Sequence, residues 1–166
     1  MPTSTPENIA HFHRVILHAL DRLYAAFPHP LEIKVIELTE LAMGASDNAA
    51  SKLEATFESL HFLKDEGLLK YSDHYSEDST LFQVQLSMKA LSVLGHVLDA
   101  SGTAELHDHQ QTLIARIRNV LAISDQGANA AKLNRISPVD QVAMQLFTLA
   151  IAATPVAPTP KTNKYD

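Results

Sequence analysis

The residues of this 166-residue chain with the clearest capacity for chemistry are its nine histidines, because imidazole is a common ligand for transition metals. The densest group is His107-Asp108-His109, and His11, His13 and His18 form a second group. Residues two apart on a helix point about 200° away from each other, so His107 and His109 share a site only within a loop. His11 and His18 share one helical face, but two ligands do not complete a zinc site. We therefore expect no metal and no cofactor.

The sequence also lacks the usual signatures of enzymes. It has no glycine-rich phosphate loop, no Gly-x-Ser-x-Gly elbow and no His-Glu-x-x-His motif. Cysteine is absent, which excludes disulfides, thiolate metal sites and cysteine nucleophiles. The paired acids Asp65-Glu66 and Glu77-Asp78 fall at an expected helix end and an expected turn, where carboxylates are normally solvated. We expect no catalytic residues and a protein that is not an enzyme.

Apolar residues at helical spacing predict the first three helices. A helix begins near Pro6 and carries one apolar stripe from Ile9 to Phe27. Residues 31–35 alternate like a short strand that gives way to a helix from about Lys34, although a longer second helix also fits. The next helix begins at Ser46-Asp47-Asn48 and ends at Asp65-Glu66-Gly67.

A β-hairpin is predicted directly after that third helix. Leu68–Tyr71 and Leu81–Leu86 read as two strands, and the polar stretch from Ser72 to Thr80 between them is too long for a two-residue turn. Antiparallel pairing would give Leu68, Tyr71, Phe82, Val84 and Leu86 a core to face. Ser87 then begins another helix, which we expect to continue past Leu98.

The segment FLKDEGLLKY…LFQVQLSMKALSVL resembles the recognition helix, wing and trailing helix of the winged helix-turn-helix superfamily. The resemblance covers residues 10–100 and points to no particular family within it. It implies a mainly α fold, with a winged-helix core of three helices plus a β-hairpin wing at residues 6–100. A C-terminal helical extension at 103–153 and a disordered, proline-rich tail at 154–166 complete the expected organisation.

The last predicted helix has more apolar surface than a peripheral helix needs. Ser137-Pro138-Val139-Asp140 is a strong helix start, and Val142, Leu146 and Phe147 follow on one face. Met144, Leu149 and Ile151 lie off that face and predict a surface for a protein partner or for a homodimer.

We expect a cytoplasmic protein without membrane contact. The stretch Val142 to Ala153 is shorter than the roughly 20 residues that span a bilayer. The N-terminal MPTSTPEN has neither the basic nor the apolar region of a secretory signal.

Charge decides between two functions for such a fold. Residues 1–86 hold six basic and thirteen acidic side chains, a net charge of −7, whereas the rest of the chain carries +1. Duplex binding needs a basic face, so the acidic half argues against nucleic acid, although it leaves it possible. We expect a non-catalytic winged-helix interaction module, a subunit or adaptor of a larger assembly, and the alternative is a dimeric DNA-binding transcriptional regulator. In either case a polar strip on the third helix is the expected contact with partner or nucleic acid: Asn48, Ser51, Lys52, Thr56 and Ser59.

Overall fold

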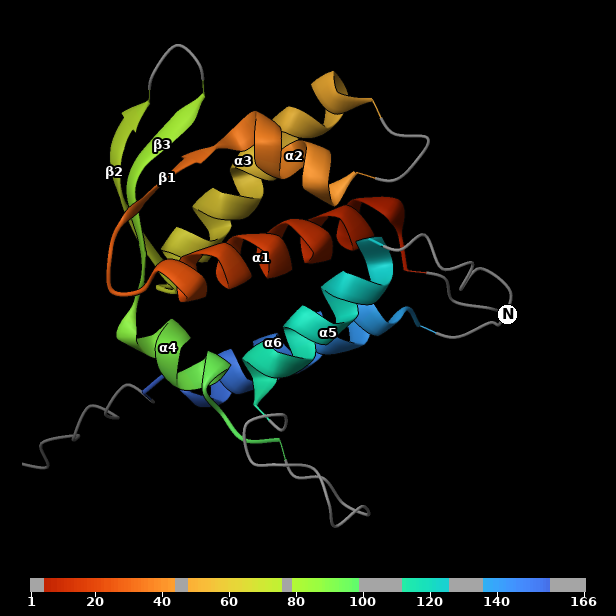
Figure 1. Cartoon of the computed structure of the whole chain (residues 1–166), viewed down its shortest axis with the longest axis vertical. Coiled ribbons are helices and arrows are strands. Elements are labelled where there is room, and N and C mark those ends of the chain that lie inside the picture. Colours follow the sequence, from red (N-terminus) through yellow and green to blue (C-terminus); the bar gives the residue numbers. More distant parts are fainter. Residues whose placement is uncertain (1–4, 44–47, 76–78, 99–111, 126–135, 156–166) are drawn as a thin grey trace, which may run out of the picture.

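The fold is mainly helical, with a small antiparallel sheet at one side (Figure 1). The computed structural model describes residues 5–43, 48–75, 79–98, 112–125 and 136–155. Within these ranges the elements follow one another as α1 (Glu7–Ala26), β1 (Leu31–Lys34), α2 (Val35–Ala42), α3 (Ala49–Asp65), β2 (Leu69–Tyr75), β3 (Thr80–Leu86), α4 (Met88–Leu94), α5 (Leu113–Asp125) and α6 (Pro138–Ala152).

Helix α1 lies at the centre of the molecule. Figure 1 shows it between α2 and α3 on one side and α5 and α6 on the other, and it contacts all four helices. Val15, Ile16 and Leu17 are consecutive yet all fully buried, as expected for a helix covered on more than one side. The sequence predicted one buried face for this helix, whereas the structure buries residues on more than one face.

The short strand before the second helix is confirmed. Ile33 is the fully buried residue of β1, and α2 begins directly afterwards at Val35. The side chain of Asn48 caps α3 by accepting a hydrogen bond from the main-chain nitrogen of Ala50. After α3 ends, Gly67 takes φ of 70°, a conformation that glycine adopts without strain.

The predicted hairpin is also confirmed, with two register shifts between β2 and β3, the second of them between Ser72 and Tyr75. Strand β3 lies between β1 and β2 and is antiparallel to both. Both pairings shift by one residue around Gln83, whose φ is +56°. This bulge reverses the alternation of side chains along the strand, so Leu81 is fully buried on the same side as Val84, and Phe82 is only half-buried.

Helices α4 to α6 close the other side of α1. Helix α4 is capped by Ser87 and ends at Leu94, earlier than predicted, and Val97 then pairs with Thr112 in an isolated β-bridge. The start of the predicted helical extension, residue 103, lies outside the described residues, which place the start of α5 at Leu113. Buried residues of α1, the sheet, α5 and α6 form one hydrophobic cluster. No helix among the described residues has both the length and the hydropathy needed to cross a membrane.

Candidate functional site

The first part of the predicted polar strip lies exposed at the start of α3. Asn48 is occupied in capping the helix, and the Ser51 hydroxyl donates to the main-chain oxygen of Asn48 at 2.8 Å. Lys52 is less accessible, with a side chain 16% exposed, and its Nζ lies 2.8 Å from Oε1 of Glu7 on α1. The ammonium group of Lys52 is therefore neutralised within the chain.

Thr56 and Ser59 do not belong to an exposed strip, which corrects the prediction for these two residues. Oγ1 of Thr56 lies 3.1 Å from Nε2 of His11 and 2.9 Å from Oγ1 of Thr39, in a buried polar cluster between α1, α2 and α3. Ser59 is buried and donates to the main-chain oxygen of Ala55. The burial of Thr56 could have been inferred from helical spacing, because Thr56 lies four residues before the core residue Leu60 and therefore on the same face of the helix.

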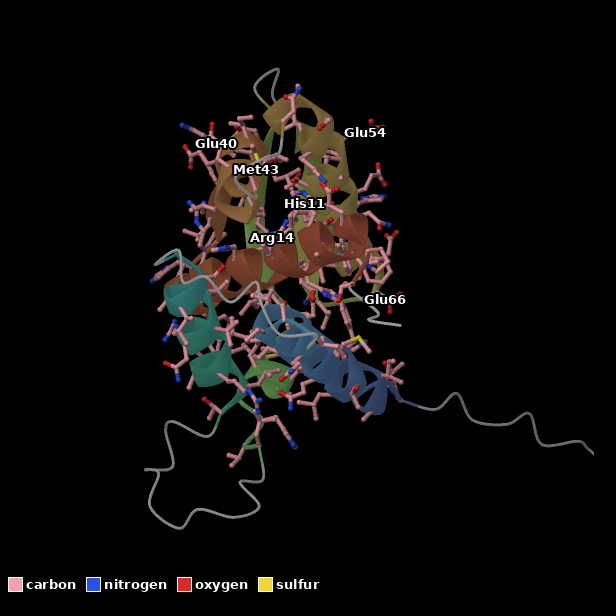
Figure 2. All side chains as sticks on the ribbon, turned by 90° about the vertical axis from the view of Figure 1, so that its right-hand side faces the viewer. His11, Arg14, Glu40, Met43, Glu54 and Glu66 are labelled. Carbon is pink, nitrogen blue, oxygen red and sulfur yellow. The ribbon has the colours of Figure 1, made fainter. Side chains whose placement is uncertain are left out.

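The exposed face of α3 is acidic. Glu54, Glu58 and Asp65 are exposed, and Glu66 follows directly after the helix. Figure 2 shows Glu54 and Glu66 at the outer edge of the molecule, away from His11. The second lysine of the helix, Lys64, is half-buried with Nζ 4.4 Å from the ring centroid of Tyr71. Among the described side chains of α3, the exposed ones therefore include acids and no lysine or arginine.

A buried pair of ionisable groups joins α1 to α6. Nδ1 of His13 donates to Oδ1 of Asp140 at 2.6 Å, and their side chains are 5% and 6% exposed. The Ser137 hydroxyl donates to Oδ2 of Asp140, while the main-chain nitrogen of Asp140 donates to Ser137 Oγ. The sequence identified Ser137 and Asp140 as a helix start, but nothing in it indicated His13 as the partner.

The pKa of Asp140 reflects this environment. Burial raises the pKa, but hydrogen bonds from His13, Thr5 and Ser137, together with the charge of His13, outweigh burial and leave the pKa below 3.8. Asp140 is therefore a carboxylate at neutral pH, and it serves to hold α6 against α1.

Two of the three residues predicted to form an oligomer surface on α6 are exposed, and the third is not. Met144 and Ile151, which lie seven residues apart on one face, are 59% and 74% exposed. Leu149 is partly buried and packs against the hydrophobic core of its own chain. Of the three predicted residues, Met144 and Ile151 are thus available to a second molecule, and Leu149 is not.

Histidines do not gather into a metal site in the part of the chain that is described. No group of three or more His, Asp or Glu side chains there has the geometry to hold a metal ion. His107 and His109 lie outside the described residues. His11 and His13 instead take part in separate buried contacts, with Thr56 and with Asp140.

Two surfaces and one buried pair are the features from which function can be inferred. They are the acidic face of α3, the apolar face of α6 and the contact between His13 and Asp140. Comparisons of the chain with protein-family models, with curated proteins and with solved structures gave no match.

Proposed function

We propose that this chain is a non-catalytic winged-helix interaction module, a subunit or adaptor of a larger assembly. The order helix, strand, helix, helix, hairpin supports the winged-helix part of the proposal. The central position of β3 between β1 and β2 supports it as well, because the strand after α1 then joins the hairpin in one sheet. In this arrangement α3 takes the place of the recognition helix.

The acidic face of α3 is the observation that carries the proposal. A duplex is bound mainly through neutralised phosphates, and Glu54, Glu58 and Asp65 would each repel them. The same carboxylates attract a basic protein surface, which makes a lysine- or arginine-rich partner the complementary one. Self-association through Met144 and Ile151 on α6 is a second proposed contact, separate from α3.

Paired titrations of the full chain test the proposal. A labelled random duplex is added at low and at physiological salt, and an arginine-rich peptide is added under the same conditions. We expect the peptide to shift the amide NMR signals of α3, and the duplex to bind weakly or undetectably at physiological salt. The peptide shifts should disappear in the double variant Glu54→Lys/Glu58→Lys.

The opposite result would establish the alternative, a dimeric DNA-binding regulator. Its signature is a nanomolar, salt-sensitive affinity for duplex that is lost on Lys52→Glu. Glu7→Gln provides the matched control, because it removes the carboxylate that pairs with Lys52 and so increases any contribution of that lysine to duplex affinity. A duplex affinity that is lost in Lys52→Glu and increased in Glu7→Gln would overturn the proposed function.

A further inference from the structure

A pocket of about 350 Å³ opens where α1, the end of α3, the start of α4 and the end of α6 meet. Its residues come from four helices and from Glu66, Leu68 and Thr154 just outside them, so its shape is set by the packing of several elements. Pockets for small molecules begin at roughly 300 Å³, and a cavity of roughly 150 Å³ lined by apolar side chains already holds benzene. The volume therefore suits a molecule of two fused rings.

Aromatic rings form the walls of this pocket. The rings of Phe12 and Phe147 are stacked, with centroids 5.7 Å apart and planes 4° apart. The ring of Phe62 meets Phe12 edge-on, with centroids 5.4 Å apart and planes at 81°. Phe62 is 43% exposed, so it retains apolar surface that a ligand would cover. A flat aromatic ligand can continue this ring arrangement.

The polar residues of the pocket are few and of both signs. Nζ of Lys89 donates to the main-chain oxygen of Glu66 at 3.0 Å, which fixes the ammonium group over the end of α3. Glu66 itself is exposed, and Figure 2 shows it at the open edge of the molecule, above α6. With one basic and one acidic residue in its lining, the pocket favours neither ligand charge, whereas a neutral hydroxyl group can accept from an ammonium group or donate to a carboxylate.

We propose that this pocket binds a small uncharged aromatic alcohol with one or two rings. The rings would lie against Phe12, Phe62 and Phe147, and the hydroxyl group would face Lys89 and Glu66. This site adjoins the acidic face of α3, because Phe62 and Glu66 line it, but it does not depend on the function proposed above. Because α3 and α6 both contribute residues, an occupant would bridge the two helices that carry the proposed partner surfaces.

Fluorescence titration with 2-naphthol tests the proposal on the full chain. The chain contains no tryptophan, so the fluorescence of the naphthol can be followed without that background. For a ligand of this size we expect saturable binding with one site per chain and a Kd of about 10–100 μM. Absence of saturable binding up to about 1 mM would overturn the proposal.

Two matched phenylalanine variants show whether the pocket is the site. Phe62→Ala removes an aromatic wall and should weaken binding about tenfold. Phe27→Ala removes a ring of nearly equal exposure, 44%, at the end of α1 outside the pocket, and should leave the affinity within about twofold. Thermal melting of both variants checks that each is folded. Equal losses in the two variants would mean that the naphthol binds elsewhere and that the proposal is wrong.

Charged analogues test the part played by Lys89 and Glu66. Naphthalene-2-carboxylate and 2-(aminomethyl)naphthalene should each bind about tenfold more weakly than 2-naphthol. In Glu66→Gln the carboxylate analogue should recover most of that loss, because its repulsion is gone. Tighter binding of either charged analogue by the unaltered chain would overturn the assignment to a neutral alcohol.

A second copy of the chain is the competing occupant. Sedimentation velocity in the presence of saturating 2-naphthol distinguishes it from a small molecule. We expect the sedimentation coefficient to stay unchanged when the ligand binds. If binding instead dissociates a dimer in proportion to saturation, then a partner chain occupies the pocket and the proposal is wrong.

Discussion

His13 and Asp140 lie 127 residues apart in the chain, yet their side chains form a buried contact of 2.6 Å. His13 belongs to the central helix α1, and Asp140 belongs to the first turn of α6. A carboxylate in the first turn of a helix is favoured by the helix dipole, and here it also accepts from Ser137. One carboxylate thus both begins α6 and fixes it to the core.

Acid should weaken the contact between His13 and Asp140. The pKa of Asp140 is lower in the folded protein than the ordinary value of 3.8, because the hydrogen bonds from His13, Thr5 and Ser137 outweigh the effect of burial. A carboxylate with a depressed pKa stabilises the fold above its unfolded pKa, and that stability is lost as the pH falls through its folded pKa. We therefore expect the contribution of Asp140 to be complete near neutral pH and to be lost below about pH 4.

The variant Asp140→Asn isolates this effect because it keeps the shape of the side chain and removes its charge. It should lower the free energy of unfolding at pH 7 by about 1.5–3 kcal/mol. Urea unfolding of both proteins between pH 7 and pH 3 measures the difference, which should shrink as the pH falls below 4. A difference that does not change with pH would show that the charge of Asp140 contributes nothing.

Much of the fold was predictable from local sequence signals. Capping residues such as Asn48, Ser87 and Ser137 and the stop at Gly67 act within one turn of the chain, and they placed the helix ends close to where they are found. The antiparallel pairing of β2 with β3 was predictable for the same reason. These signals need only the neighbouring residues.

Features that depend on distant parts of the chain were not predictable. The burial of Thr56 requires His11 and Thr39 from two other helices, and the partner of Asp140 comes from the opposite end of the sequence. A strict alternation predicted Phe82 inside the core, but the bulge at Gln83 turns Leu81 inward instead. The two uncovered side chains of α6 could be distinguished from Leu149 only once the packing was known.

The positive φ of Gln83 at the bulge in β3 predicts how substitutions there change stability. Gln83 adopts φ of +56°, which costs a residue other than glycine about 1–2 kcal/mol, and a β-branched residue fits there worst. Gln83→Val should therefore lower the free energy of unfolding by about 1–2 kcal/mol, while Gln83→Gly should raise it by up to about 1 kcal/mol. Urea unfolding measures both.

Gln85→Val in the same strand is the matched control, because Gln85 is not among the residues with positive φ. It removes only the exposed 3.3 Å hydrogen bond from Gln85 Nε2 to the main-chain oxygen of Pro28, so it should lower the free energy of unfolding by no more than about 0.5 kcal/mol. Equal effects of valine at positions 83 and 85 would remove the conformational explanation and leave a general effect of polarity on this strand.

Reversing the charge of α3 should increase the affinity of the chain for duplex. In Glu54→Lys/Glu58→Lys two exposed acids become bases, a change of +4 in charge, and weak salt-sensitive binding to random duplex should appear at low salt. The same change at two exposed acids of α2, Glu37→Lys/Glu40→Lys, is the matched control for net charge. Fluorescence anisotropy with a labelled duplex measures both. Equal duplex binding by the two variants would mean that total charge, and not the position of α3, governs the affinity.

The exposed face of α6 predicts self-association, and the structure indicates which residue to change. Leu149→Lys would damage the chain's own core, because Leu149 packs partly against it. Ile151 is 74% exposed, so Ile151→Lys should leave the melting temperature nearly unchanged. Full burial of a large apolar side chain is worth about 1.5–3 kcal/mol, so loss of Ile151 from a symmetric interface removes that contribution twice.

Sedimentation equilibrium at micromolar concentration measures the outcome. We expect the unaltered chain to sediment as a dimer, and both Ile151→Lys and Met144→Lys to shift it toward monomer. Ile123→Lys, at a 57% exposed position on α5, is the control and should leave the dimer intact. An unaltered chain that is already monomeric would show that Met144 and Ile151 remain in water, and the proposed contact through α6 would then be wrong. A dimer that survives both α6 variants would place the interface on another face of the molecule.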